Sequence, residues 1–246
     1  MIVLFTDFGC HGPYMGQMRL VLETEAPGVP VIELFNNAPN YDPLASAHLL
    51  AAYVNEFPAD TVFLCVVDPG VGSDLRKPMV YQIDDHWFVG PGNGLFDVIA
   101  ARGKNIKAWE INWHPGSLSN SFHGRDLFAP VAAKLVRGES PPGNLIEHNP
   151  AHPDIEKWPR IIYIDDFGNA MTGLWAEGIS SNSRLKLSTH TLEYARTFSE
   201  VTPGQSFWYE NANGLVEIAI NQGSAAEMLN INLGDEVTLL EPGMSV

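Results

Sequence analysis

Short apolar runs alternate with helix-like segments through the first half of the chain. The runs predict strands at residues 2–5, 29–34, 61–67, 79–83, 87–89 and 107–111. Helices are predicted at residues 14–25, 43–56, 95–101 and 125–137. The clearest helix start is at Asp42 and Pro43, because Asp can cap a helix and Pro suits its first turn. This alternation predicts an α/β fold for residues 1–140, with a mostly parallel sheet flanked by helices.

The pattern changes in the second half of the chain. Residues 141–159 are rich in Pro and Gly, as in Pro141-Pro142-Gly143 and Trp158-Pro159, and predict a linker between domains. Beyond the linker, strand-like pieces are spaced by Gly and Asn turns, at residues 160–164, 185–187, 205–209, 215–220 and 236–240. These pieces predict a smaller all-β domain over residues 160–246.

The composition narrows the possible functions. The 246 residues carry a formal net charge of −15 with only 14 Lys and Arg, so we expect no nucleic-acid partner, whereas a cationic ligand would be attracted. The chain opens directly on an apolar strand, and no apolar run reaches membrane-spanning length, so we expect no membrane partner and a cytoplasmic location. Cys10 and Cys65 lack C-x-x-C spacing and are expected as free thiols.

The run Thr61-Val62-Phe63-Leu64-Cys65-Val66-Val67 ends abruptly in Asp68, which stands on a Pro/Gly turn. The run is typical of a strand buried on both faces. Ligands of open α/β sheets bind at the carboxyl ends of the strands, which is where Asp68 is expected. Taken alone, the segment is also compatible with a strand followed by a purely structural turn.

Two further segments place polar side chains where a ligand could reach them. Asp7 follows an apolar strand and precedes Gly9, so it could accept both hydroxyl protons of a ribose diol or, alternatively, cap a helix. His123 lies just before a predicted helix, beside Arg125 and Asp126. These two neighbours could pair or cap the helix, which would leave His123 free to reach a ligand.

The segment Asp165-Asp166-Phe167-Gly168-Asn169 opens the second domain after a strand. It offers too few oxygen ligands for a calcium loop. The ring of Phe167 and the amide of Asn169 are better suited to a purine, which binds by stacking on a ring and by hydrogen bonds to an amide. The eight His residues show no H-x-x-x-H or H-E-x-x-H spacing, so no metal site is expected.

Six segments in a fixed order carry a resemblance to a known family: Thr6-Asp7-Phe8-Gly9, Asp68-Pro69-Gly70-Val71-Gly72, Pro91-Gly92-Asn93-Gly94, Phe122-His123-Gly124-Arg125-Asp126, Asp165-Asp166-Phe167-Gly168-Asn169 and Gly214-Leu215-Val216-Glu217-Ile218-Ala219. Nearly the whole chain resembles the S-adenosylmethionine hydroxide adenosyltransferases, relatives of the S-adenosylmethionine-dependent fluorinase and chlorinase. The resemblance implies an N-terminal α/β domain, a C-terminal barrel-like β domain, and a homotrimer with sites between subunits. It also implies hydrolysis of a small-molecule substrate, S-adenosylmethionine, to adenosine and methionine.

The resemblance implies roles for individual residues as well, with no cofactor and no metal. Asp68, an Arg and His123 would orient and activate water. The substrate would be bound by Asp7, Tyr41, Gly124, Asp165, Phe167, Asn169, Phe198 and Asn211.

Several positions differ from the usual family pattern. The family places its Arg seven positions after the Asp, which is Leu75 here, with Arg76 next. Either the turn carries one extra residue and Arg76 fills the role, or the catalytic group is incomplete. Asp68 and Gly124 stand where the halide-using relatives carry a Tyr and a Ser. Because a carboxylate repels halide, water is the expected nucleophile.

Three functions are compatible with the sequence. The leading one is hydrolysis of S-adenosylmethionine. The second is a catalytically impaired protein that binds adenosine or S-adenosylmethionine, and the third is hydrolysis of another 5′-substituted adenosine. Gly12, Ala212 and Gly173 replace an acidic residue, a Ser and an Asn that are usual in the family, and this leaves methionine recognition open.

Overall fold

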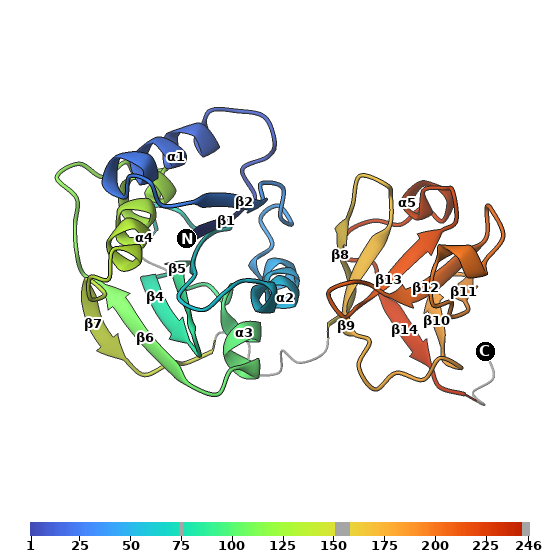
Figure 1. The fold of residues 1–246 in the computed structure, drawn as a ribbon. Coiled ribbons are helices and arrows are strands. Elements are labelled where there is room, and N and C mark those ends of the chain that lie inside the picture. Colours follow the sequence, from blue (N-terminus) through green and yellow to red (C-terminus); the bar gives the residue numbers. More distant parts are fainter. Residues whose placement is uncertain (74–75, 151–157, 243–246) are drawn as a thin grey trace. The chain divides into compact units, whose positions relative to one another are not determined.

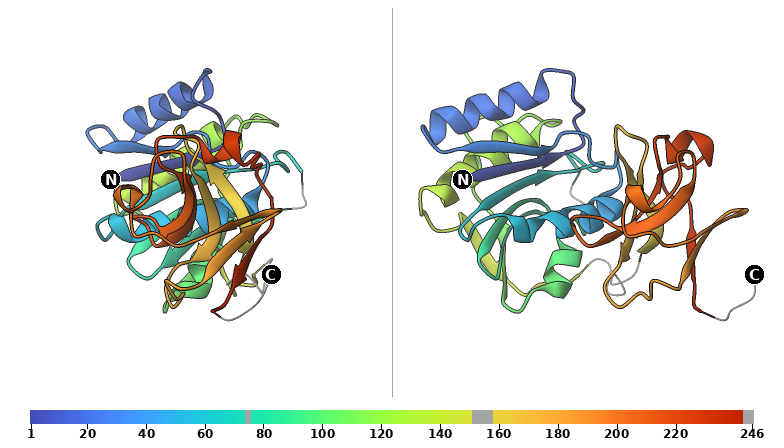
Figure 2. Two further views of the ribbon diagram at one scale, coloured as in Figure 1. Left: turned by 90° about the vertical axis from the view of Figure 1, so that its right-hand side faces the viewer. Right: turned by 45° about the vertical axis from the view of Figure 1, so that its right-hand side comes forward.

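The computed structural model describes residues 1–73, 76–150 and 158–242. Leu75 therefore lies outside the described residues. The chain divides into two compact units, Met1–Ile155 and Glu156–Val246 (Figures 1 and 2).

The N-terminal unit is built on a seven-stranded sheet with the order β2-β1-β3-β5-β4-β6-β7. The strands are β1 (Ile2–Thr6), β2 (Val31–Phe35), β3 (Val62–Val66), β4 (Pro78–Ile83), β5 (His86–Pro91), β6 (Ile106–Ile111) and β7 (Gly143–Ile146). The pairs β1–β2, β1–β3 and β3–β5 are parallel, whereas β4–β5, β4–β6 and β6–β7 are antiparallel.

The α/β class is therefore confirmed, but the sheet is mixed rather than mostly parallel. The reason lies in the connection between β4 and β5. Only Asp84 and Asp85 join them, with Asp84 at a φ of 50°. A two-residue connection can join only antiparallel strands, and it favours positive φ values.

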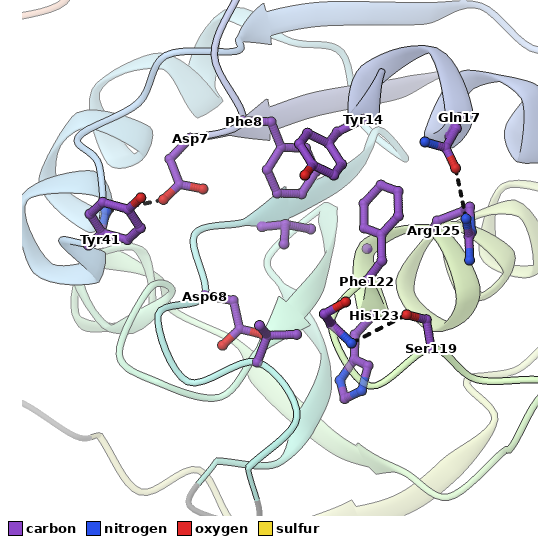
Figure 3. Close-up of a pocket in the computed structure, with 14 residues that line it drawn as sticks. Asp7, Phe8, Tyr14, Gln17, Tyr41, Asp68, Ser119, Phe122, His123 and Arg125 are labelled. Atoms are coloured by element: carbon purple, nitrogen blue, oxygen red, sulfur yellow. Dashed lines mark hydrogen bonds between the residues drawn. The ribbon is translucent and has the colours of Figure 1, made fainter. Parts of the chain in front are cut away.

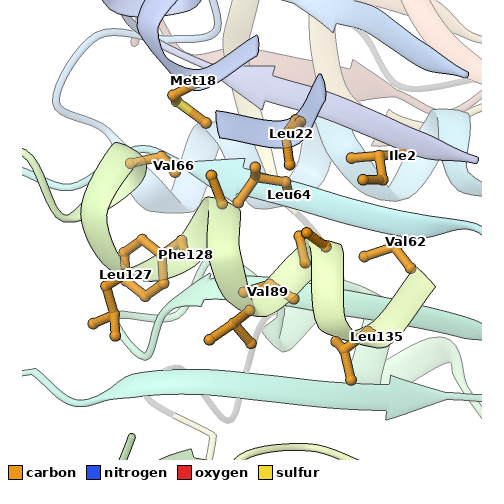
Figure 4. Packing of buried hydrophobic residues seen from close by; sticks show 14 of the residues in the cluster. Ile2, Met18, Leu22, Val62, Leu64, Val66, Val89, Leu127, Phe128 and Leu135 are labelled. Carbon is orange, nitrogen blue, oxygen red and sulfur yellow. The ribbon is translucent and has the colours of Figure 1, made fainter. Parts of the chain in front are cut away.

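Helices cover both faces of this sheet. They are α1 (Tyr14–Glu25), α2 (Pro43–Tyr53), α3 (Asp97–Arg102) and α4 (Ala129–Val136), with a 3₁₀ turn at Val54–Glu56 and a π-helical turn at Gly124–Phe128. Helix α1 and the π-helical turn before α4 bury Met18, Leu22 and Phe128 against Leu64 and Val89 of the sheet (Figure 4). On the other face, the ring of Tyr53 at the end of α2 contacts Phe35 of β2. Successive residues of a strand point to opposite faces, so β3 is buried throughout.

The predicted start of α2 is confirmed. The Asp42 carboxylate accepts hydrogen bonds from the backbone N–H groups of Leu44 (3.1 Å) and Ala45 (2.9 Å), and Pro43 occupies the first turn. The cap satisfies two of the N–H groups that a helix leaves unpaired at its start.

The segment predicted as a linker, residues 141–159, contains β7 and the start of β8. Strand β7 pairs with β6, and a Cβ on Gly143 would lie only 2.1 Å from the backbone oxygen of Glu110. This close backbone approach explains the glycine. Leu145 is 65% exposed, so this edge strand carries no buried, periodic pattern that the sequence could reveal. The rest of the prediction, residues 151–157, lies outside the described residues.

The C-terminal unit contains two small sheets. One has the order β12-β13-β9-β8 and the other β11-β10-β14. The strands are β8 (Trp158–Ile164), β9 (Ala170–Trp175), β10 (Arg184–Leu187), β11 (His190–Leu192), β12 (Ser206–Glu210), β13 (Leu215–Ile220) and β14 (Val237–Leu240). A 3₁₀ turn, Phe198–Glu200, and helix α5 (Ala225–Met228) complete the described part.

Isolated bridges link the edges of the two sheets, between Arg160 and Glu236 and between Tyr194 and Trp208. The strands thus close on themselves around a core that contains Trp208, which gives a barrel-like arrangement. Strand β9 was not predicted. It follows a turn directly and contains Gly173, which packs against the Trp158 backbone.

No helix among the described residues is both long and apolar enough to cross a membrane.

Candidate active site

The carboxyl ends of β1 and β3 carry the two acidic residues that the sequence singled out. These strands pair in parallel, with Thr6 opposite Val66, so Asp7 and Asp68 emerge at the same edge of the sheet. A cavity of about 530 Å³ opens there (Figure 3). It is lined by Asp7, Phe8, Tyr14, Gln17, Tyr41, Val66, Asp68, Val71, Ser119, Ser121, Phe122, His123, Gly124 and Arg125.

Arg76 is the partner of Asp68. Its Nε donates to Asp68 Oδ1 at 2.9 Å and its Nη2 donates to Asp68 Oδ2. The two side chains are only 6% and 4% exposed. The guanidinium also lies over the ring of Phe128, 5.8 Å from its centroid. The two-point geometry fixes the direction of the carboxylate at the cavity wall.

His123 joins this pair. Its Nδ1 lies 3.2 Å from Arg76 Nη2. Because a guanidinium can only donate, Nδ1 accepts this hydrogen bond, and the proton of the neutral ring is on Nε2. Burial, followed by the charge of Arg76, lowers the pKa of His123 below its ordinary value. The ring is thus held neutral near pH 7.

A close backbone contact brings the Asp68 turn to the His123 loop. Gly72 has a φ of +79°, and a Cβ at this position would lie 2.3 Å from the backbone oxygen of Asn120. Only glycine allows both the left-handed backbone and this approach. The contact joins segments that are about fifty positions apart in the sequence.

Asp7 lies on the other side of the cavity. Its Oδ2 accepts a hydrogen bond of 3.1 Å from the backbone N–H of Tyr41. The alternative that Asp7 caps a helix is wrong, because α1 begins after Pro13 without a side-chain cap. Burial raises the pKa of Asp7, and the nearby charge of Asp68 adds to this effect.

Arg125 and Asp126 pair with each other, as one alternative predicted. Arg125 Nε donates to Asp126 Oδ1 at 2.5 Å, and Arg125 Nη1 donates to Gln17 Oε1 at 2.7 Å. The hydrogen bond with Arg125 lowers the pKa of Asp126. Both residues belong to the π-helical turn before α4, a type of irregularity that is frequent at functional sites.

Four of the five residues predicted in the second half, all except Asn211, line a cavity of about 630 Å³ in the C-terminal unit. It is lined by Asp165, Phe167, Asn169, Phe198, Tyr209, Glu217, Ile220, Gln222 and Gly223. The ring of Phe167 is 80% exposed, whereas Phe198 packs edge-on against Tyr209, with centroids 5.5 Å apart.

Asp165 organises the turn at this second cavity. Its Oδ1 accepts from the N–H groups of Phe167 (2.9 Å) and Asn169 (2.8 Å), and its Oδ2 accepts from Asn169 Nδ2 (3.1 Å). The carboxylate therefore orients Phe167 and Asn169, and the amide oxygen of Asn169 remains available to a ligand.

Asn211 is used within the protein. Its Oδ1 accepts from the N–H groups of Asn213 and Leu215, both at 3.0 Å, and its Nδ2 donates to Glu217 at 2.8 Å. Glu217 also accepts from the Tyr209 hydroxyl at 2.5 Å, and burial raises its pKa. Neither Glu217 nor Tyr209 was predicted, although an acidic residue inside an apolar strand is a signal that could have drawn attention to Glu217.

Among the residues that the structure describes, no group of three His, Cys, Asp or Glu side chains could hold a metal ion. Cys10 is exposed and Cys65 is buried, and both are free.

Comparisons with known proteins decide the family. Residues 2–144 match the model of the SAM hydroxide adenosyltransferase N-terminal domain, and residues 159–238 match that of the C-terminal domain. This chain belongs to the SAM hydroxide adenosyltransferase family. A relative from Thermus thermophilus, named (R)-S-adenosyl-L-methionine hydrolase, is 32% identical over 97% of this chain and 99% of its own length. A relative of the same name from Salinispora arenicola is 33% identical over 94% of each chain.

A solved structure from Thermotoga maritima, titled an uncharacterized conserved protein, matches with a TM-score of 0.88 and 28% identity. The match covers 98% of this chain and 100% of that one.

For this SAM hydroxide adenosyltransferase, the structure brings Asp68, Arg76 and His123 together and places Asp7, Tyr41 and Gly124 around the same cavity. Arg76 contacts Asp68, as the first of the two alternatives predicted. The rings of Phe8 and Tyr14 also line the cavity, and no role was predicted for them. Both lie within seven positions of Asp7, and this closeness in the sequence was the signal that could have pointed to them as cavity-lining residues.

Proposed function

We propose that this protein hydrolyses (R)-S-adenosyl-L-methionine to adenosine and L-methionine. The family and the names of relatives that match almost their full length support this activity. The observation that carries the proposal is the buried Asp68–Arg76 pair in contact with His123 at the wall of a cavity that also holds Asp7. Burying such a pair is costly, which favours a role in the reaction over simple binding of a nucleoside.

In this proposal Asp7 binds the two ribose hydroxyls. Its Oδ2 already accepts one backbone hydrogen bond, and Oδ1 keeps its acceptor capacity for the diol. Adenine is held by Phe167, Asn169 and Phe198 of the second cavity, with Tyr41 nearby. Asp165 acts as a positioning residue, because its oxygens are bonded to the turn that carries Phe167 and Asn169.

The reaction is an in-line displacement at the ribose C5′ carbon. Water donates a hydrogen bond to Asp68 and accepts one from Nε2–H of His123, which points a lone pair at C5′. A bond forms between this oxygen and C5′ while the C5′–S bond breaks. The electron pair of the C5′–S bond goes to sulfur. The proton of the attacking water passes to the Asp68 carboxylate and then to solvent. Methionine leaves as a neutral thioether, so neither a general acid nor a cofactor is needed.

Arg76 orients Asp68 in this scheme. Both of its hydrogen bonds to the carboxylate are formed before substrate binds, so little reorganisation accompanies the reaction. Holding water and C5′ in line is worth several kcal/mol, and about 7–11 kcal/mol in the best-oriented intramolecular reactions.

We further propose that the functional unit is a homotrimer with each site between neighbouring subunits. The ribose and water groups line one cavity and the base-binding groups line another. Tyr41 and Phe167 are 78% and 80% exposed, as expected of rings that a ligand or a neighbouring subunit covers. Light scattering after size-exclusion chromatography tests the assembly, and a monomer that is fully active would contradict it.

A labelled-water experiment tests the activity itself. The protein is incubated with each sulfur epimer of S-adenosyl-L-methionine in oxygen-18 water, and adenosine is examined by mass spectrometry. We expect labelled adenosine from the (R) epimer. Unlabelled adenosine would contradict attack of water at C5′. Binding without turnover would support the alternative of a nucleoside-binding protein.

A further inference from the structure

Three aromatic rings line the N-terminal cavity without a role in the reaction described above. Phe8 follows β1, Tyr14 opens α1, and Phe122 precedes the π-helical turn. Their centroids are 5.7 Å apart for Phe8–Tyr14, 5.7 Å for Phe8–Phe122 and 5.3 Å for Tyr14–Phe122. We call these three rings the aromatic wall.

The aromatic wall lies across the cavity from Asp68. In Figure 3, Asp68 is at the lower side of the cavity, and the rings of Phe8 and Tyr14 are at the upper side, to the right of Asp7. An in-line displacement requires the leaving atom on the side of C5′ opposite to the attacking oxygen. With water at Asp68 and the ribose at Asp7, the sulfur therefore faces the aromatic wall.

We propose that the aromatic wall binds the positively charged sulfonium group of the substrate and makes the site selective for that charge. This inference rests on the proposed function and names how the same site recognises its substrate. The face of an aromatic ring carries negative potential and attracts a cation most strongly where water is excluded. The carboxylates among the described lining residues are Asp7 and Asp68, which serve the ribose and the water.

Rings suit this position better than a carboxylate would. The charge on sulfur disappears as the C5′–S bond breaks. A carboxylate at the sulfur would therefore stabilise the substrate far more than the transition state and would slow the reaction. Rings provide a weaker attraction, which is enough for recognition. The neutral thioether of methionine loses even that attraction, and this favours product release.

Tyr14 is the ring best placed to contact a ligand. It is 48% exposed, whereas Phe122 is 8% exposed and already has the guanidinium of Arg125 over its ring, 5.2 Å from the centroid. Tyr14 can also be changed with little risk to folding, because it is half exposed in the first turn of α1.

The test compares two ligands that do not react and that differ in charge at one atom. One is S-adenosylhomocysteine, a neutral thioether. The other is its analogue with a protonated methylamine in place of sulfur. Calorimetry gives both dissociation constants for the wild-type protein, Tyr14→Leu, Tyr14→Phe and Tyr41→Leu, at a pH where the amine is protonated.

We expect the wild-type protein to prefer the cationic ligand. Tyr14→Leu should reduce this preference about tenfold, and Tyr14→Phe should keep it, because the ring remains. Tyr41→Leu is the matched control, since it should weaken the binding of both ligands equally. Equal preferences in Tyr14→Leu and Tyr14→Phe, or no preference in the wild-type protein, would overturn this inference alone. If neither ligand binds and no adenosine is formed from S-adenosylmethionine, the proposed function fails together with this inference.

Discussion

Arg76 holds Asp68 by two parallel hydrogen bonds, although both side chains are almost completely buried. The Nε–Oδ1 distance is 2.9 Å, and the same guanidinium contacts His123 at 3.2 Å. Burying two charges is costly, and the mutual attraction of such a pair often only balances the cost. The pair is therefore better explained by what it does to Asp68, whose carboxylate it fixes at the cavity wall.

Asp68→Asn should abolish turnover and spare adenosine binding. The substitution keeps the shape of the side chain but removes the group that accepts the proton of water, which typically costs about 100-fold to 10,000-fold in rate. Adenosine release is followed by chromatography and adenosine affinity by calorimetry. Asp60→Asn, at an exposed turn, is the control that should change neither. Full activity in Asp68→Asn would show that the water-activating role is wrong.

Arg76→Met should destabilise the protein. It leaves the buried Asp68 carboxylate without its partner, a change that costs about 3–5 kcal/mol in comparable buried pairs. The double variant Asp68→Asn/Arg76→Met should recover part of this loss, because the unpaired charge is gone. Urea denaturation of the four proteins gives the coupling free energy. If Arg76→Met is as stable as the wild-type protein, the pair contributes nothing to folding.

Asp7→Ala should remove the preference for a ribose over a deoxyribose. A hydrogen bond from a hydroxyl to a carboxylate contributes about 1.5–3 kcal/mol to binding. The wild-type protein should therefore bind adenosine at least about tenfold more tightly than 2′-deoxyadenosine. The variant should bind both nucleosides with similar affinity in calorimetric titrations. A preference that survives in Asp7→Ala would place the diol elsewhere.

Gly124→Ser should impair hydrolysis without creating a halogenase. A Cβ at this position would lie 3.3 Å from atoms of each of Met18, Phe122 and Phe8, so the cavity wall must shift. The Asp68 carboxylate remains and continues to repel halide. Mass spectrometry of reactions in chloride and fluoride should detect no 5′-halogenated nucleoside. Gly116→Ser, at an exposed position with open space around it, is the control. Accumulation of a halogenated product would refute the role given to Asp68.

His48 should make the protein less stable in acid. Burial lowers its pKa from 6.5 to about 4. Above pH 6.5 neither the folded nor the unfolded protein protonates His48, so it has no effect there. Between pH 6.5 and 4 the unfolded chain takes up the proton and the folded protein resists it. The free energy of unfolding should therefore fall by about 1.4 kcal/mol per pH unit from this group.

Urea denaturation between about pH 4.5 and 7.5 tests this effect, because His titrates in that range. His48→Gln should show a shallower loss of stability in acid than the wild-type protein. The control His114→Gln changes an exposed His and should leave the pH profile intact. Identical profiles for His48→Gln and the wild-type protein would contradict the prediction. His123 adds a smaller effect of the same sign, which is common to all three proteins.

The sequence by itself determined the class of the fold and the two acidic strand ends. Asp7 and Asp68 could be recognised because each follows a buried apolar run, and the ends of neighbouring parallel strands must meet at one edge of a sheet. The six ordered motifs were also enough to recognise the family, because each motif is a local stretch of sequence that can be identified without knowing the fold.

Only the tertiary structure decided which side chains meet. Spacing along an irregular turn does not determine where a side chain points, so the sequence left open whether Arg76 reaches Asp68 or the catalytic group is incomplete. The structure places Arg76 on Asp68. The approach of Gly72 to Asn120, which joins two distant loops, has no local signal either. The same holds for the rings of Phe8, Tyr14 and Phe122, which meet because β1, α1 and the turn before α4 pack around one cavity. Contacts of this kind are set by packing between segments, which no single stretch of sequence contains.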